Sequence, residues 1–287
     1  MVGRLSLVGT PIGNLGDITL RAVEALKDAD RIYAEDTRRS RTLLSHLGIE
    51  GKRLVSLHAH STERAIGAAV EVLMSGENVA LVTDAGMPGV SDPGAELVRA
   101  AQKAKIEVTV LPGPSAVTAA VALSGLVDGP FTFLGFLPRK GLKRIEALKH
   151  LSSSAEPQIF FESPHRIKGT LNDLLEVCGP TRRVALCREI TKKFEETLLL
   201  PLSELAAPEF RELWQGEFTL VVEKSPTPGQ TDQRQYDLDE RARQLLQEGH
   251  SVKSVATTLC NELTQRGKKT SRRDLYARVL ALTESEN

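Results

Sequence analysis

Three loops rich in glycine and proline follow apolar, strand-like segments, and they are the part of the sequence best suited to hold a small molecule. They read TPIGN (residues 10–14), DAGMPGVSDPG (residues 84–94) and PGPS (residues 112–115). Glycine lets the backbone approach a ligand closely, and proline fixes a loop before the ligand arrives. Because the ends of parallel strands open on one edge of a sheet, we expect the loops to face one crevice. Asp84, which opens the longest loop, could cap a turn, but its position favours ligand binding.

These loops lack the phosphate-binding sequence GxxxxGK[ST] and the dinucleotide-binding sequence GxGxxG, which counts against ATP hydrolysis and hydride transfer. His58 and His60 are too few for a closed zinc site, which takes about four ligands. The cysteines Cys178, Cys187 and Cys260 form no CxxC pair, and an odd count suits a reducing compartment. The sequence has no run of about 20 apolar residues. We therefore expect no metal ion, no membrane span and a cytoplasmic location.

Several side chains that could accept a proton lie at or near predicted strand ends. They are Glu35, Asp36, Glu162, His165 and Glu189. A positioned base typically accelerates a reaction by about 10² to 10⁴. Other roles stay open for them, because His165 could simply start a helix. Glu162 and Glu189 could instead form structural ion pairs with nearby arginines.

The charge balance excludes a globally basic nucleic-acid-binding protein, because 37 basic residues face 37 acidic ones. Local clusters of arginine and lysine nevertheless occur in each predicted module. The basic residues that could contact a nucleic acid are Arg38, Arg39, Arg139, Lys140, Lys143, Arg144, Arg166, Lys268, Lys269, Arg272 and Arg273. Each cluster could instead be a solvated face. For an RNA ligand, a single-stranded or distorted segment is expected, because an A-form duplex limits side-chain access.

The segments that position these residues alternate between strand and helix patterns, which indicates an α/β fold. Apolar residues make up 41% and charged residues 26% of the chain, as in an ordinary globular protein. Strands are predicted at residues 5–8, 31–35, 54–57, 79–82 and 107–111, and again at 131–134, 158–161, 183–186, 197–200 and 218–222. The run at 79–82 is apolar throughout, as expected for burial on both faces. The last two strands are expected to be antiparallel, because little lies between them.

The chain is expected to divide into two α/β domains, a linker and a small helical module. The predicted ranges are 1–127, 128–224, 225–235 and 236–287. The linker is polar and cannot bury surface. In the module, apolar residues recur on one face of a helix that Ser251 caps, and a further helix begins at Ser271. We therefore expect a bundle of the helix-turn-helix type.

Seven segments of the sequence are each weak evidence for a protein family when taken alone, but their combination is specific. They are TPIGNLGDIT (10–19), AEDTR (34–38), DAGMPGVSDPG (84–94), LPGPSA (111–116), FFESPHR (160–166), REITKKFEE (188–196) and GEF (216–218). Together they resemble the bacterial ribosomal RNA small subunit methyltransferase I family, which belongs to the tetrapyrrole-methylase superfamily. The resemblance implies two α/β domains of tetrapyrrole-methylase type with an interdomain cofactor cleft, followed by the helical module.

The function that this resemblance implies is S-adenosylmethionine-dependent methylation of the ribose 2'-hydroxyl of one cytidine near the decoding site of 16S rRNA. It further implies 16S rRNA within the 30S subunit as the partner, with the basic residues named above as the RNA contacts, and a homodimer. The residues that it places at the cofactor are Pro11, Asp84, Ala85, Gly86, Pro88, Ser115, Ala116, Phe161, Glu162, Arg188, Glu189, Gly216 and Glu217. The catalytic candidates are Glu35, Glu162 and His165. Two alternatives stay open: methylation of a tetrapyrrole of the precorrin or uroporphyrinogen type, and a non-catalytic RNA-binding assembly protein.

Overall fold

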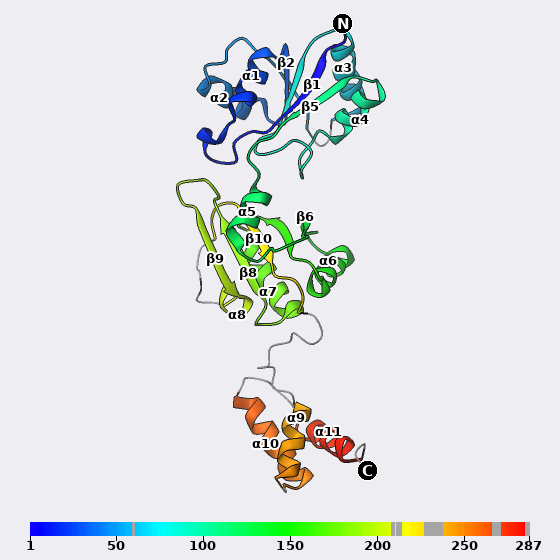
Figure 1. Ribbon diagram of the computed structural model, residues 1–287, viewed down its shortest axis with the longest axis vertical. Helices are drawn as coiled ribbons and strands as arrows, with labels where there is room; N and C mark the ends of the chain where they lie inside the picture. The colour runs from blue at the N-terminus through cyan, green and yellow to red at the C-terminus, as the bar shows by residue number, and fades with distance from the viewer. Residues whose placement is uncertain are drawn as a thin grey trace. The chain divides into compact units, whose positions relative to one another are not determined.

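The computed structural model describes residues 1–58, 61–207, 210, 214–226, 238–248, 250–265 and 271–284 of the 287-residue chain. The chain forms two compact units, Met1–Ser225 and Pro226–Asn287 (Figure 1). The first unit contains two five-stranded sheets, and the second is helical. None of the helices in the described part of the chain has the length and hydropathy that crossing a membrane requires.

The first sheet is fully parallel, with the order β3-β2-β4-β1-β5. Its strands are β1 (Arg4–Val8), β2 (Arg31–Ala34), β3 (Arg53–Ser56), β4 (Val79–Val82) and β5 (Glu107–Leu111). The helices of this sheet are α1 (Leu20–Asp28) and α2 (Thr37–His46) on one face, and α3 (Glu63–Met74) and α4 (Ala95–Lys103) on the other. As predicted, β4 is buried along its whole length, because its successive side chains enter the cores on opposite faces.

The second sheet is mixed, with the order β6-β7-β10-β8-β9, and only β6 and β7 are parallel. Its strands are β6 (Thr132–Phe136), β7 (Gln158–Glu162), β8 (Arg183–Arg188), β9 (Glu196–Pro201) and β10 (Phe218–Val222). The expected pairing of the last two strands was wrong, because each is antiparallel to β8 and they lie on its opposite sides. All five residues of β10 are buried, which suits a central strand better than an edge.

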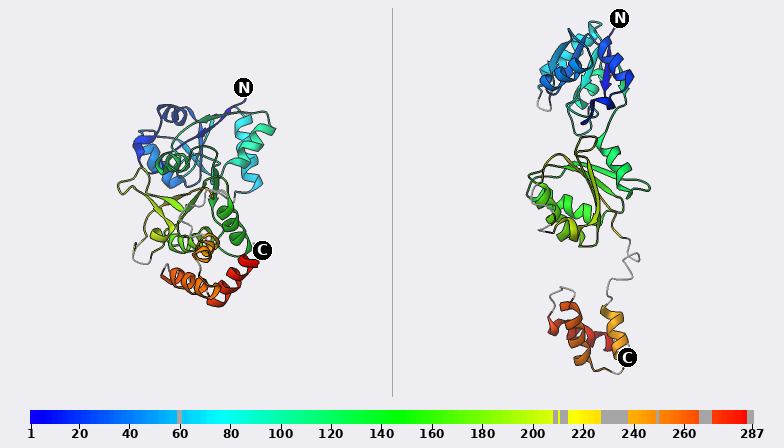
Figure 2. Two further views of the ribbon diagram at one scale, coloured as in Figure 1. Left: turned by 60° about the horizontal axis from the view of Figure 1, so that its bottom comes forward. Right: turned by 90° about the vertical axis from the view of Figure 1, so that its left-hand side faces the viewer.

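Helices cover both faces of the second sheet. The helices α6 (Leu142–Ser153), α7 (Ile167–Cys178) and α8 (Leu202–Leu205) share one core with the sheet. Helix α5 (Ala116–Ser124) lies on the opposite face (Figure 2). The sequence assigned α5 to the first domain, but its buried Val117 and Ala120 pack with Ile159 and Ala185 of the second sheet. By its packing, this helix belongs with the second sheet.

The C-terminal unit is a three-helix bundle made of α9 (Leu238–Gln247), α10 (Val252–Gln265) and α11 (Arg272–Glu284). Its core includes Val255, Leu259 and Leu275. The predicted caps are present, because the Ser251 hydroxyl accepts the Ser254 N–H at 3.3 Å and the Ser271 hydroxyl accepts the Arg273 N–H at 3.2 Å. Most of the predicted linker, residues 227–235, lies outside the described residues.

Candidate active site

The three glycine-rich loops meet at the carboxyl edge of the first sheet, as the sequence predicts. The Thr10 N–H donates to the Gly86 carbonyl at 2.9 Å, and the Gly86 N–H donates to the Thr10 carbonyl at 3.1 Å, which ties the first loop to the second. A Cβ on Gly9 would lie 2.8 Å from the Cα of Gly113, so the start of the first loop also touches the third loop. No side chain fits in that space, which explains glycine at both positions.

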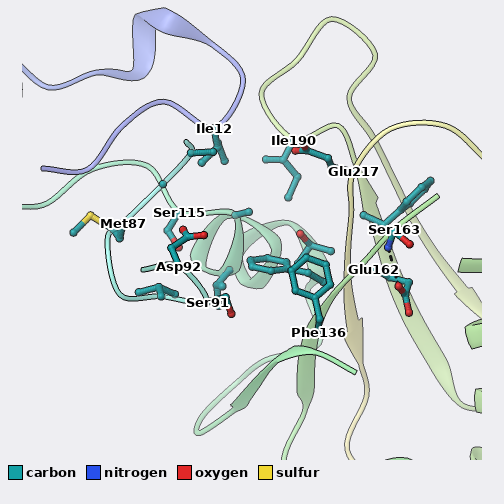
Figure 3. A pocket seen from close by; sticks show the side chains of 18 of the residues that line it. Ile12, Met87, Ser91, Asp92, Ser115, Phe136, Glu162, Ser163, Ile190 and Glu217 are labelled. Carbon is teal, nitrogen blue, oxygen red and sulfur yellow. Dashed lines mark hydrogen bonds between the residues drawn. The ribbon is translucent and has the colours of Figure 1, made fainter. Parts of the chain in front are cut away.

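A cavity of about 330 Å³ opens between these loops and the second sheet (Figure 3). The first domain lines it mainly with backbone and with small or apolar side chains, and the second domain adds aromatic rings. The rings of Phe136 and Phe161 pack edge to face, with centroids 5.5 Å apart. The volume falls within the range of about 300 to 1,000 Å³ that is typical of small-molecule sites.

Only part of the predicted cofactor set reaches this cavity. The members that line it are Ala85, Gly86, Ser115, Ala116, Phe161, Glu162 and Glu217. The members that do not line it, all of them in the described part of the chain, are Pro11, Asp84, Pro88, Arg188, Glu189 and Gly216. Sequence reasoning missed the other twelve lining residues, among them Ile12, Met87, Ser91, Asp92, Phe136 and Ile190. Most of these fall inside the seven segments quoted above, so the segments pointed to the site more accurately than the residues chosen from them.

Asp92 is the acidic residue that the first domain contributes to the cavity wall. Figure 3 shows it beside Ser115. Burial, together with the negative charges of Glu35 and Asp84, raises the pKa of Asp92 from 3.8 to about 6. The neighbouring Thr83 side chain opposes this shift, but less strongly. The cavity therefore holds an aspartate that a cationic ligand would stabilise in its ionised form.

Asp84 does not line the cavity, and it connects neighbouring strand ends. Its Oδ1 accepts a 3.0 Å hydrogen bond from the backbone N–H of Asp36, and its Oδ2 lies 3.3 Å from Nη1 of Arg39. The Oε2 of Glu35 accepts the backbone N–H of Asp84 at 3.5 Å. Pro11 and Asp84 line a neighbouring hollow beside α2. In this arrangement Asp84 and Glu35 join the ends of β2 and β4.

Glu162 lines the cavity, yet its side chain is fully enclosed (0% exposed). Its Oε2 accepts a 2.7 Å hydrogen bond from the Thr170 hydroxyl, and its Oε1 accepts a 2.8 Å hydrogen bond from the Ser163 N–H. The same Oε1 lies 3.3 Å from Nε of Arg166, so the structural ion pair that the sequence left open is present. Since both oxygens are engaged within the second domain, Glu162 is poorly placed to take a proton from a ligand.

Glu189 and Gly216 form a rigid rim next to the cavity. The Oε1 of Glu189 accepts hydrogen bonds from Nζ of Lys192 and from the backbone N–H of Glu217, each 2.9 Å long. Burial alone would raise the pKa of Glu189, but the bonds from Lys192 and Glu217 lower it below its usual value. Gly216 has φ 95°, and a Cβ there would lie 2.6 Å from Cγ of Glu189. The rim therefore depends on glycine at this position.

The predicted RNA-contacting residues differ in how far they are available. The exposed members are Arg38, Arg39, Arg139, Lys140, Lys143, Arg272 and Arg273. Arg144 is 13% exposed, because its guanidinium bonds to Asp173 at 2.6 Å and to the Thr170 hydroxyl at 3.0 Å on α7. Lys268 and Lys269 lie outside the described residues. His165 is exposed and does not line the cavity as described.

A metal centre finds no support in the described ranges, where no three His, Cys, Asp or Glu side chains gather closely enough to hold an ion. His60, one of the two histidines considered in the sequence, lies outside those ranges.

Comparisons with known proteins show which sequences this chain is similar to. The sequence profile of the tetrapyrrole (corrin/porphyrin) methylases matches residues 4–206. Ribosomal RNA small subunit methyltransferase I of Halalkalibacterium halodurans is 47% identical, over 77% of this chain and 76% of that protein. The protein of the same name from Xylella fastidiosa is 44% identical, over 93% of this chain and 97% of that protein.

Solved structures with low sequence identity share the fold. The methyltransferase CobJ superposes with a TM-score of 0.59 at 22% identity, over 78% of this chain and 95% of that chain. Diphthine synthase superposes with a TM-score of 0.61 at 19% identity, over 77% of this chain and 90% of that chain. The expected fold class is confirmed, and the chain belongs to the tetrapyrrole (corrin/porphyrin) methylase family and, within it, to the ribosomal RNA small subunit methyltransferase I proteins.

Proposed function

We propose that the chain transfers the methyl group of S-adenosylmethionine to rRNA of the small ribosomal subunit, at the ribose 2'-hydroxyl of a cytidine near the decoding site. The observation that carries this proposal is the interdomain cavity with its aspartate. It occurs in a chain whose relatives, at 44% and 47% identity, are named ribosomal RNA small subunit methyltransferase I. The proposal extends to the 30S subunit as partner and to a cytoplasmic homodimer, by the same family relationship.

The residues that line the cavity fit this methyl donor. S-adenosylmethionine carries positive charge on its sulfonium and ammonium groups, and Asp92 offers the opposite charge. The rings of Phe136 and Phe161 add apolar and quadrupolar surface that favours a cation. Gly86, with φ 80°, allows the backbone to approach the donor without a Cβ in between. When bound, the donor supplies an activated methyl group.

The chain's own contribution to such a reaction is mainly positioning. In-line displacement requires the ribose oxygen, the methyl carbon and the sulfur to be collinear. Holding reactants in such a geometry can supply about 7 to 11 kcal/mol of the barrier. The glycine-rich loops and the second sheet can do so from opposite sides. As the bond from oxygen to the methyl carbon forms and the bond from sulfur to that carbon breaks, the ribose hydroxyl also loses its proton. None of the three predicted bases is placed to take this proton from a ligand in the cavity, because Glu162 is enclosed and Glu35 and His165 do not line the cavity, so the proton passes to solvent.

The proposal is tested by incubating the full chain with radiolabelled S-adenosylmethionine and either 30S particles or naked 16S rRNA from a strain that lacks the ribose methyl group. We expect one methyl group per particle, which nuclease digestion and mass spectrometry assign to a 2'-O-methylcytidine. Methylation of a base, or no incorporation into either substrate, would contradict the proposal.

The same assay separates the two alternatives. A uroporphyrinogen acceptor that is methylated while rRNA is not, also after removal of residues 226–287, would assign the chain to tetrapyrrole chemistry. Binding of rRNA without any methyl transfer would indicate an assembly protein. Sedimentation of the purified chain tests the homodimer.

A further inference from the structure

The loop between β8 and β9 carries an aromatic ring that the core does not use. Phe194 is 64% exposed. Nζ of Lys193 lies 5.7 Å from the centroid of this ring. An exposed phenylalanine next to a lysine is a combination that offers both a stacking surface and a positive charge.

The backbone of this loop is held firmly. Glu189 and Thr191 have φ of 52° and 67°, a left-handed conformation that residues other than glycine adopt only where the surroundings enforce it. The Thr191 N–H donates to the Glu195 carboxylate at 2.5 Å, and the Glu195 N–H donates to the Lys192 carbonyl at 3.1 Å. The ring of Phe194 is therefore presented on a preorganised loop, which lowers the ordering cost of binding.

Residues at the base of the loop line the cavity. Ile190 and Glu217 line it and are seen on the same wall in Figure 3. Lys192 bonds to Glu217 at 3.0 Å, and a Cβ on Gly13 of the first domain would overlap the Lys192 side chain. Four residues of chain span at most about 14 Å. The Cα of Phe194 therefore lies within about 14 Å of the Cα of Ile190, which lines the cavity. The ring is thus close enough to meet nucleotides next to one whose ribose enters the cavity.

We propose that Phe194 stacks on an unpaired nucleobase adjacent to the target nucleotide, while Lys193 lies near the neighbouring phosphate. This inference rests on the proposed function, because it needs an RNA substrate at the cavity. Aromatic side chains are the usual platforms for bases of single-stranded RNA, and they act with little regard to sequence. The ring is a positioning residue: it holds the strand and takes no part in the chemical step.

The test compares Phe194→Leu, which keeps an apolar side chain but removes the π face, with Phe194→Trp, which enlarges that face. Phe131→Leu is the matched control, because Phe131 is also exposed (38%) but precedes β6, at the end of the sheet away from the cavity. The probe is a fluorescein-labelled, cytidine-containing single-stranded RNA of 12 nucleotides. A fully paired duplex of the same sequence serves as the comparison.

Phe194→Leu should weaken binding of the single strand by about 5- to 150-fold. It should also raise the KM for the rRNA substrate more than it lowers kcat. Phe194→Trp and Phe131→Leu should bind as the native chain does, and duplex binding and S-adenosylmethionine affinity should not change in any of these three phenylalanine variants. Lys193→Gln should reduce the slope of log affinity for RNA against log salt concentration by about 1, which corresponds to the loss of one phosphate contact.

Native affinity and KM in Phe194→Leu would overturn the inference. A lower sedimentation mass of this variant with unchanged RNA affinity would also overturn it, because the ring would then belong to a contact between copies. If the native chain methylates no rRNA, the proposed function fails. If it methylates rRNA and Phe194→Leu does so equally well, only the stacking role fails.

Discussion

Replacing Asp92 by asparagine should stabilise the protein at neutral pH and at the same time weaken its binding of a cationic ligand. The pKa of Asp92 is about 6 in the folded chain against an ordinary value of 3.8, because burial and the charges of Glu35 and Asp84 disfavour its ionised form. A pKa difference of this size corresponds to about 3 kcal/mol by which folding favours the protonated over the ionised form of the side chain. Since the carboxylate is only partly buried, solvent screening reduces the expected gain in stability to about 1 kcal/mol.

The direction of the pH dependence follows from the raised pKa. The folded chain binds the Asp92 proton more tightly than the unfolded chain, so the native protein loses stability as the pH rises from about 4 to above 6. Asp92→Asn has no such loss. The two proteins should be equally stable near pH 4, and at about pH 7.5 the variant should unfold about 2 to 4 °C higher.

Urea unfolding across this pH range measures the stability, and calorimetric titration with S-adenosylmethionine measures the affinity. In the native chain the affinity should fall by up to about tenfold per unit as the pH drops below 6, whereas the affinity of the variant should be lower and independent of pH. Asp128→Asn is the control, because this aspartate is 81% exposed and its substitution should change neither quantity. A variant that is less stable than the native chain at neutral pH, or that binds the donor equally well, would refute the reasoning.

Other substitutions test the structural roles of single residues. Gly9→Ala should destabilise the first unit by about 1 to 3 kcal/mol in urea unfolding and weaken donor binding in calorimetry, because its Cβ would lie 2.8 Å from backbone of the third loop. Arg144→Ala should lower stability by about 1 to 3 kcal/mol and leave the salt dependence of RNA binding unchanged, since its guanidinium is bonded to α7. Lys140→Ala should leave the stability unchanged and reduce the slope of log affinity for RNA against log salt concentration by about 1. Thr170→Val should cost about 1 to 3 kcal/mol in urea unfolding, because it removes a donor from the enclosed Glu162 carboxylate.

The order of elements could be predicted from the sequence, but the pairing of strands in the second sheet could not. The apolar run of β4 predicts burial on both faces, and its side chains do enter two cores. The insertion of β10 between β7 and β8 depends on contacts far apart in the chain. A short separation along the chain favours a hairpin locally, and burial of all five β10 residues outweighs it.

The site was predictable as a set of segments and less so as individual residues. Asp92 stands in a quoted segment, but its raised pKa arises from Glu35 and Asp84 at the ends of two other strands. Arg144 and Lys140 are equivalent in the sequence as members of one basic cluster. Only the fold shows that Arg144 is turned onto α7 while Lys140 stays exposed.

Under the proposed function, the arrangement of charge at the first sheet's carboxyl edge lets one site suit a cationic donor beside a polyanionic substrate. Asp36 and Asp84 are each paired with an arginine of α2, Arg38 at 2.7 Å and Arg39 at 3.3 Å, and both guanidiniums remain largely exposed. On that side the edge presents positive charge, which attracts phosphate. Asp92 has no such partner among the described residues, so its negative charge is directed to the cavity. Removing Asp84 would therefore act less through a lost ligand contact than through Arg39, whose charge would no longer be held at the edge.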